Sequence, residues 1–183
     1  MLPERITSLP VVLRPLTAAD ASRVRELAGD VEVARMTALI PHPYSPDTAA
    51  TWIATHEKER ATGTAYVYGI TRAEDALLVG SIEWRAAPNA PPSLGYWVGR
   101  AYWGHGLATA AARAIIAMAF SRLDHDALSA VHLARNPASG RVLEKCGMSL
   151  TGRERRPHRG GPDEDFCVWS ITRERWSALA RAL

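Results

Sequence analysis

Two glycines separated by a single residue, Gly104 and Gly106, stand between a short β-rich segment at 94–98 and a long apolar helix. The helix is predicted because apolar residues recur at helical spacing after Gly106: Leu107, Ala111, Ile115 and Met118. A strand that leads through glycines into a helix N-terminus presents unpaired amides and the positive end of the helix dipole to an anion. We therefore expect the amides from Gly104 through Thr109 to surround a pyrophosphate, with close helix packing as the alternative reason for the glycines.

Two other glycine loops that bind phosphate fit this segment less well. A Walker loop needs Gly-Lys-Ser/Thr, and no lysine lies near Gly106. The dinucleotide-binding fingerprint needs glycine or alanine where Thr109 stands, and an acidic residue at the end of the next strand. The loop is therefore assigned to neither class.

The rest of the chain alternates between strands and helices. Strands are predicted from β-rich runs at 11–16, 66–71, 77–84, 128–134, 149–155 and 165–171. Helices are predicted near 21–27, 47–60 and 137–146 and from Arg173 onward, with Asp20, Asp47 and Asn136 as N-caps. The order indicates one α/β domain over residues 1–183, without repeats or an interdomain linker.

The composition argues against several other classes of protein. The 47% hydrophobic and 22% charged residues are typical of a globular chain. The formal charge of +3 helps to attract a polyanion but does not support nucleic-acid binding, which uses a dense basic stripe. No Cys or His pair has metal-site spacing, so no metal is expected. No apolar run is long enough for a signal peptide or a membrane span, so we expect a cytoplasmic protein without a membrane partner.

Four segments resemble the GNAT superfamily of acetyltransferases, and within it the RimJ/RimL branch, whose members acetylate protein N-termini and various small amines. They are LRPLTAADA at 13–21, PHPYSPDTAATWI at 41–53, LGYWVGRAYWGHGLATAA at 94–111 and NPASGRVLEKCGM at 136–148. The resemblance implies the GNAT fold, a single α/β domain with a mixed, twisted sheet flanked by helices. Its central strands splay apart to form the acetyl-CoA cleft.

The resemblance also implies acetyl-CoA as co-substrate and a set of residues that bind it. They are Trp97, Val98, Arg100, Trp103, Gly104, His105, Gly106, Leu107, Ala108, Thr109, Asn136, Ser139 and Arg141. The strand around Tyr96 to Val98 is expected to hold the pantetheine arm as an added strand would. In the superfamily pattern an Arg or Gln stands three residues before the first glycine, whereas this chain has Ala101 there, preceded by Arg100.

Three residues are expected to be catalytic: Ser139, Tyr96 and Glu83. Ser139 is the candidate general acid for the leaving thiolate. The alternative is that Asn136 caps the helix that follows it and Ser139 is only the third residue of that helix, so that capping alone would explain Asn136 and Ser139. A backbone N–H of the strand around Tyr96 is the candidate oxyanion donor. Relatives often carry a Glu where this chain has Ser93, so Glu83 is the remaining candidate base, with a solvated strand carboxylate as the alternative.

The acceptor site is expected to involve Tyr44, Trp52, Glu83 and His158, although Tyr44 and Trp52 are also suited to fill the core. The predicted function is transfer of an acetyl group to a primary amine, either a protein N-terminal α-amine or a small-molecule amine. The alternative is a catalytically weak module that binds or senses acyl-CoA. The sequence leaves open whether the chain forms a homodimer.

Overall fold

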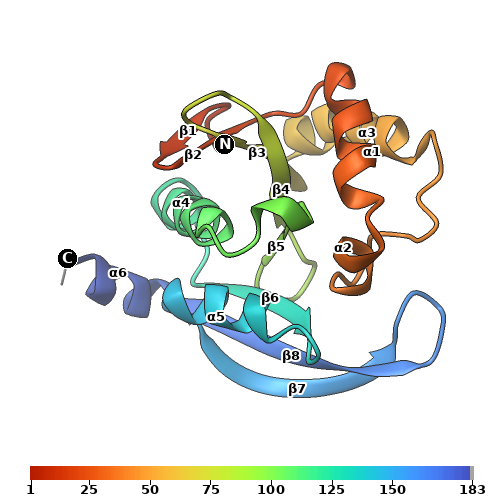
Figure 1. The fold of residues 1–183 in the computed structure, drawn as a ribbon. Helices are drawn as coiled ribbons and strands as arrows, with labels where there is room; N and C mark the ends of the chain where they lie inside the picture. The colour runs from red at the N-terminus through yellow and green to blue at the C-terminus, as the bar shows by residue number, and fades with distance from the viewer. Residues whose placement is uncertain (182–183) are drawn as a thin grey trace.

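The chain folds around one eight-stranded sheet in the order β1-β2-β3-β4-β5-β6-β8-β7 (Figure 1). The computed structural model describes residues 1–181, so the last two residues of the expected domain lie outside the described residues. The strands are β1 (Ile6–Ser8), β2 (Val11–Arg14), β3 (Ala65–Arg72), β4 (Leu78–Arg85), β5 (Ser93–Val98), β6 (Ala127–Leu133), β7 (Ser149–Pro157) and β8 (Asp163–Thr172). The helices are α1 (Ala21–Ala28), α2 (Val31–Arg35), α3 (Thr48–Thr62), α4 (Leu107–Arg122), α5 (Pro137–Lys145) and α6 (Arg173–Arg181), with 3-10 turns at Ala18–Asp20 and Arg100–Tyr102.

The sheet opens between β5 and β6. The other neighbouring strands are antiparallel, whereas β5 and β6 run parallel and pair only at Ser93 with Ser129 and Leu94 with Ala130. Beyond Leu94 the two strands diverge, and Figure 1 shows β6, β8 and β7 turning away beneath β5. The predicted mixed sheet with splayed central strands is confirmed.

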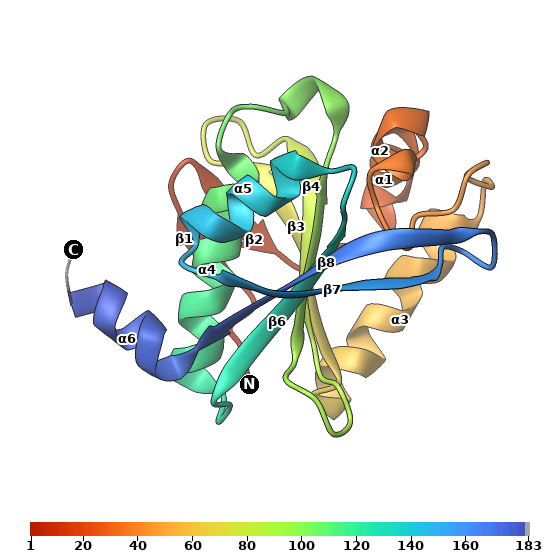
Figure 2. The same cartoon turned by 90° about the horizontal axis from the view of Figure 1, so that it is seen from below.

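Helices cover both faces of the sheet. α4 packs against β1, β2, β4 and β5 around a core that includes Ile82, Trp84 and Ile115. α1 and α3 pack on the opposite face around a smaller core that includes Val24 and Ile53, and Figure 2 shows α3 and α4 on opposite sides of the strands. α4 packs on β5, and α5 packs on β6 and against α4. The two helices therefore flank the gap between β5 and β6.

α4 is apolar around most of its circumference because it lies between the sheet and α5. Its buried residues include Ala111, Ala112, Ala114 and Ala119, and their small side chains permit close approach to the strands. Despite this composition, no helix in the described part of the chain is long and apolar enough to cross a bilayer.

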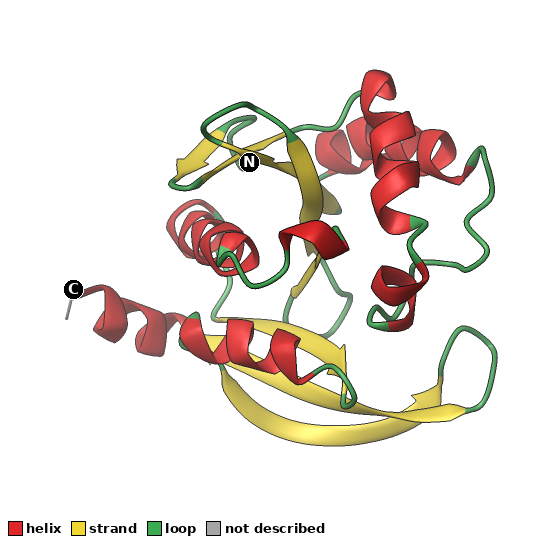
Figure 3. Cartoon of the chain, in the orientation of Figure 1, coloured by secondary structure: helices red, strands yellow, loops and turns green. Residues whose placement is uncertain are grey.

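Every predicted strand and helix is present, but two short elements were missed. β1 and α2 contain too few residues to show a periodic pattern. Asp20 stands at the predicted N-cap position of α1, but its carboxylate makes no capping bond to that helix and instead pairs with Arg14 and accepts from the Thr17 amide. Asp47 stands at the N-cap position of α3, but its side chain makes no capping bond. The long loop between α2 and α3 reaches out beside the β7–β8 hairpin (Figure 3).

Candidate active site

The glycine loop leads from the end of β5 into the N-terminus of α4. Gly104 and Gly106 have φ angles of +81° and +75°, in the left-handed region that favours glycine. A Cβ at either position would meet no heavy atom within 4 Å, so both residues face open space. Ala110 is the first residue whose amide bonds back to Gly106, at 3.0 Å, so the preceding amides of the first turn lack an intrahelical acceptor. The first turn carries no acidic residue, and a pyrophosphate fits this arrangement.

Four side chains predicted to contact the ligand are exposed: Arg100, Trp103 and His105 in and just before this loop, and Arg141 on α5. The Trp103 indole Nε1 donates to the carbonyl of Val98 at 2.6 Å, which ties the loop to the end of β5. Leu107 is buried at the start of α4, while Ala108 and Thr109 are half-buried. The loop is thus anchored by Trp103 and Leu107 while its glycines stay accessible.

Backbone groups of β5 face the gap past the point where β6 diverges. The Pro92 carbonyl accepts from Ser129 of β6 at 2.8 Å, and the Gly99 amide donates to Val79 of β4 at 2.8 Å. Because backbone direction alternates along a strand, the N–H and C=O of Tyr96 point toward the β6 side. That edge is where an extended ligand arm would pair.

Tyr96 and Ser139 meet across the gap. The Tyr96 hydroxyl lies 2.8 Å from Ser139 Oγ and donates to the Ser139 carbonyl at 3.1 Å. Burial raises the pKa of Tyr96, so the phenol stays protonated at neutral pH. Asn136 caps α5 by accepting from the Ser139 amide at 3.2 Å, and it also donates to Met36 of α2 at 3.0 Å.

Glu83 is held by an ion-pair network on the face of the sheet that α3 covers. One Arg85 nitrogen donates to Glu83 Oε2 at 2.9 Å, and the other donates to Glu59 Oε1 at 2.8 Å. The Glu83 side chain is 23% exposed and lies against Gly95 of β5, so the alternative of a freely solvated carboxylate is wrong. Sequence reasoning missed Arg85 and Glu59, and Glu59 stands in the charged run 57–60, where nothing distinguishes it from its neighbours.

The predicted acceptor residues divide between two places. Tyr44 and Trp52 are half-buried beside the smaller core, and Trp52 packs edge-on against His56 with ring centroids 4.5 Å apart. His158 lies instead in the β7–β8 hairpin, where its Nε2 is 3.1 Å from the Thr37 carbonyl and its Nδ1 is 3.2 Å from Glu164. There it lines a cavity of about 280 Å³ together with Ala38, Leu39, Pro41, Arg156, Pro157, Arg159 and Phe166.

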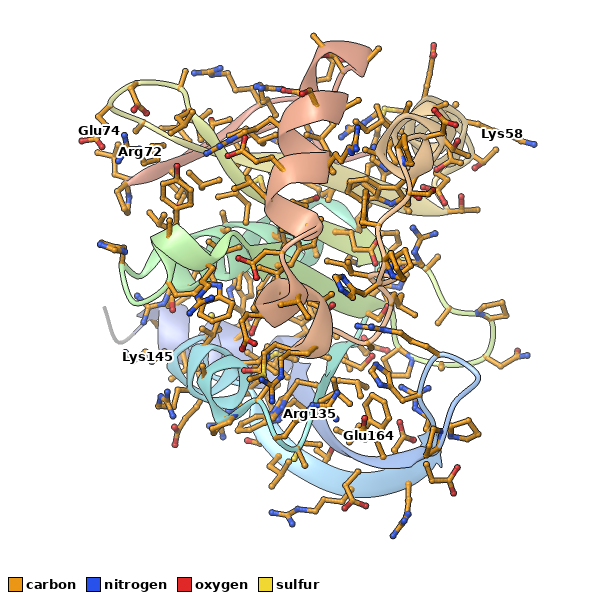
Figure 4. All side chains as sticks on the ribbon, turned by 45° about the vertical axis from the view of Figure 1, so that its right-hand side comes forward. Lys58, Arg72, Glu74, Arg135, Lys145 and Glu164 are labelled. Carbon is orange, nitrogen blue, oxygen red and sulfur yellow. The ribbon has the colours of Figure 1, made fainter. Side chains whose placement is uncertain are left out.

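Polar side chains from the lower half of the sheet hold the C-terminus of α2. Arg135 donates to the Arg35 carbonyl at 2.9 and 3.2 Å, and Arg159 donates to the Ala34 and Thr37 carbonyls. Arg135 also pairs with Glu164, and Figure 4 shows these two side chains close together. Cations are favourable at a helix C-terminus, so these bonds tie α2 to the end of β6 and to the β7–β8 hairpin.

Comparisons with known proteins agree with this geometry. The profile of the "Acetyltransferase (GNAT) domain" family matches residues 11–149. The "Uncharacterized N-acetyltransferase YoaA" of Bacillus subtilis is 27% identical over 168 residues, covering 90% of this chain and 94% of the relative. The "Putative ribosomal N-acetyltransferase YdaF" of the same organism is 26% identical over 172 residues, covering 91% of this chain and 93% of the relative.

A solved structure of similar fold carries a ligand related to the expected one. It is the ribosomal L7/L12 α-N-protein acetyltransferase RimL in complex with coenzyme A, with a TM-score of 0.82 and 16% identity over 92% of this chain and 98% of that chain. The glycine loop, the open edge of β5 and the family match together identify the co-substrate as acetyl-CoA. The chain belongs to the GNAT family of acetyltransferases and is an acyl-CoA-dependent N-acetyltransferase.

Proposed function

We propose that this enzyme acetylates a primary amine of low pKa, of which the α-amine of a protein or peptide is the leading example, as RimJ/RimL-branch enzymes do. The observation that carries the proposal is that the Glu83 carboxylate, which lies beside Gly95 of β5, is bonded to Arg85 rather than free. A carboxylate in an ion pair is a weak proton acceptor. The site therefore favours an acceptor that loses its proton readily.

The basicity of the two main classes of biological amine differs enough to decide between them. At pH 7, removing a proton from an α-amine of pKa about 7.8 costs about 1.1 kcal/mol, whereas a lysine of pKa about 10.4 costs about 4.6 kcal/mol. The difference of about 3.5 kcal/mol corresponds to several hundredfold in the neutral fraction. The similarity to an α-N-protein acetyltransferase and to a relative named for the ribosome supports the same class of acceptor.

Bound acetyl-CoA supplies a thioester carbonyl that an amine attacks. In the proposed reaction the amides of the Gly104–Gly106 loop hold the pyrophosphate, and Arg100, His105 and Arg141 add polar contacts to the same ligand. The Tyr96 backbone N–H, turned toward the gap, stabilises negative charge that develops on the carbonyl oxygen. A new C–N bond forms, the C–S bond breaks, and the amine's surplus proton leaves through water or Glu83.

Ser139 is proposed to protonate the departing thiolate, and the hydroxyl contact with Tyr96 supports this role. Because the buried Tyr96 phenol remains protonated, it can turn to donate a hydrogen bond to Ser139 Oγ as the proton leaves that oxygen. We expect Ser139→Ala to lower kcat about 100-fold between pH 6 and pH 9. Ser170→Ala is the matched control, since the Ser170 hydroxyl bonds to Leu128 on the sheet. Unchanged turnover of Ser139→Ala over this range would remove Ser139 from the mechanism.

Release of free thiol from acetyl-CoA tests the acceptor class. One peptide carries a free α-amine and no lysine, and its matched partner has a blocked N-terminus and one lysine. We expect kcat/KM for the first to exceed that for the second by at least 100-fold at pH 7. Equal values, or a preference for lysine, would contradict the proposed acceptor.

A second candidate function is binding of acyl-CoA without efficient turnover. It is favoured by Ser93, which stands where relatives often carry a Glu, and by the pairing of Glu83 with Arg85. Calorimetric titration with acetyl-CoA, followed by the thiol assay over α-amine peptides, polyamines and aminoglycosides, separates the two candidates. Tight binding without turnover on the whole panel would favour the binding module.

A further inference from the structure

A cavity opens between the loop after α2 and the tip of the β7–β8 hairpin, two segments that lie side by side in Figure 3. We call it the loop–hairpin cavity. The loop contributes Ala38, Leu39 and Pro41 to its wall, and the hairpin contributes Pro157 and Phe166, so much of the wall is apolar. Its volume of about 280 Å³ is slightly smaller than typical small-molecule pockets, so it suits one part of a ligand rather than a whole cofactor.

The titratable side chains on the wall of the loop–hairpin cavity are all basic: Arg156, His158 and Arg159. The glutamates beside them are already paired. Glu154 lies 3.2 Å from Arg156 Nε, and Glu164 contacts both Arg135 and the His158 ring. Three guanidiniums (Arg135, Arg156, Arg159) thus stand against two carboxylates (Glu154, Glu164), which leaves one positive charge in excess before His158 is counted.

The other charges of the hairpin do not remove this excess. Phe166 lines the cavity, and side chains alternate along a strand, so Asp165 faces the opposite side of the sheet. Arg155 stands opposite Asp165 in the register and therefore shares that side, and Arg153 follows the same alternation. Asp163 is not part of the cavity wall. These two arginines and two aspartates balance one another away from the cavity.

Arg159 is the guanidinium that lacks a carboxylate partner among residues 1–181. Its Nη2 donates to the carbonyls of Ala34 and Thr37, whereas its Nε and Nη1 have no hydrogen-bond partner within the same residues. Desolvation by burial lowers the pKa of Arg159, and the nearby Arg135 lowers it further, so an anion placed here would be stabilised. The loop that Arg159 contacts, residues 36–46, supplies no acidic side chain.

We propose that the loop–hairpin cavity selects acceptors that carry an acidic side chain close to the acetylated α-amine. The carboxylate accepts charge-assisted hydrogen bonds from Arg159, beside Arg156, while its methylene groups pack on Phe166. The proposal rests on the proposed function, and it names acidic N-terminal segments as the substrate class.

The bonds around α2 place the cavity close to the reaction side. Asn136, which caps α5 through the Ser139 amide, donates to the Met36 carbonyl at 3.0 Å. The cavity wall begins at Ala38, only two residues later. Two extended residues span at most roughly 7 Å, so an acceptor whose amine lies near Ser139 can place one of its next few side chains in the cavity.

Peptide binding tests this selection without any need for turnover. The probe is tetra-alanine amide with a free α-amine, in which the second, third or fourth residue is replaced by Glu or by Gln. Glu and Gln have nearly the same shape, so only the charge changes. Each peptide is titrated calorimetrically into the protein saturated with CoA, in about 0.15 M salt to screen distant charges. We expect Glu to bind at least tenfold more tightly than Gln at one of the positions. Equal binding of Glu and Gln at all three positions would overturn the proposal.

Substitutions of Arg159 assign the preference to the cavity. Arg159→Asn removes the charge, and asparagine tolerates the φ of +52° found at this residue. We expect the preference for Glu over Gln to fall to about twofold or less in this variant. Arg155→Asn is the matched control, because it removes the same charge from the other side of the same hairpin, and it should keep the full preference. A preference that survives in Arg159→Asn, or that both variants lose equally, would contradict recognition by the cavity.

Arg159→Lys separates recognition of the carboxylate from support of the loop. Lysine keeps the positive charge but not the planar fork that bonds to the Ala34 and Thr37 carbonyls. We expect this variant to retain a severalfold preference for the Glu peptide. If it loses the preference as completely as Arg159→Asn does, the effect comes from the bonds to α2, and direct recognition of the carboxylate is wrong.

Failure of the proposed function would give a different result. If the wild-type enzyme acetylates lysine side chains but not α-amines, the proposed acceptor class is wrong. The cavity is then judged with N-terminally blocked peptides in which Glu or Gln flanks a single lysine. A KM at least tenfold lower for the Glu peptide, lost in Arg159→Asn but not in Arg155→Asn, would still support recognition of an acidic side chain. Equal KM values for the two peptides would overturn it.

Discussion

The two sides of the β5–β6 gap differ in the groups that line them, which are backbone amides on one side and side chains on the other. The proposed acetyl-CoA side consists mainly of backbone amides from one continuous segment, Gly104 to Thr109. The proposed acceptor side consists of side chains from α3, β4 and the β7–β8 hairpin, as far apart in sequence as Trp52 and His158. A site built from backbone depends on local conformation, whereas a site built from side chains depends on how distant elements pack.

A single substitution should therefore disable the acetyl-CoA side. Gly106→Val places a β-branched residue at a φ of +75° and directs its side chain into the space proposed for the pyrophosphate. We expect the Kd for acetyl-CoA, measured by calorimetry, to rise about a thousandfold, or about 4 kcal/mol, from lost charged hydrogen bonds and a left-handed backbone.

Gly152→Val is the control for that substitution. Gly152 lies on β7, a Cβ there also meets nothing within 4 Å, and its φ lies outside the left-handed region. It should bind acetyl-CoA as the wild type does. Equal affinities for the two variants would show that the glycine loop does not hold the diphosphate.

The same contrast explains what the sequence could predict. The glycine loop, α4 and the Asn136 cap were predictable because each depends on neighbouring residues. The splay of β5 from β6 came from the family resemblance and not from any local pattern. Arg85 could not be placed between Glu59 and Glu83 beforehand, because that contact requires α3 to pack on β4 in one register. The bonds from Arg135 and Arg159 to α2 are similarly non-local.

The burial of His56 on α3 should make the free energy of unfolding depend on pH. The His56 pKa falls from 6.5 to about 4 on folding, so between these values the unfolded chain binds a proton that the folded chain does not. The contribution of His56 is fully present above pH 6.5 and is lost as the pH falls through about 4, by up to about 3 kcal/mol. Urea unfolding at pH 7, 5.5 and 4.5 measures this loss.

His56→Leu isolates that contribution from other titrating groups. The free energy of unfolding of the variant should fall less than that of the wild type between pH 7 and pH 4.5, because leucine binds no proton. His42→Leu, at an exposed position in the loop between α2 and α3, should retain the wild-type dependence. Identical pH profiles for wild type and His56→Leu would mean that His56 is not held neutral in the fold.

The smallest effect is expected at Asn136, which belongs to both sides of the gap. Its Oδ1 caps α5 by accepting from Ser139, and its Nδ2 reaches across to Met36 of α2. Asn136→Ala loses both bonds and should reduce the free energy of unfolding by about 1.5 kcal/mol, whereas Asn136→Asp keeps the cap and should lose about half as much. Urea unfolding at pH 7 measures both values. If the two variants are equally destabilised, the bond to Met36 carries the effect, and the tie between α5 and α2 is stronger than the local cap.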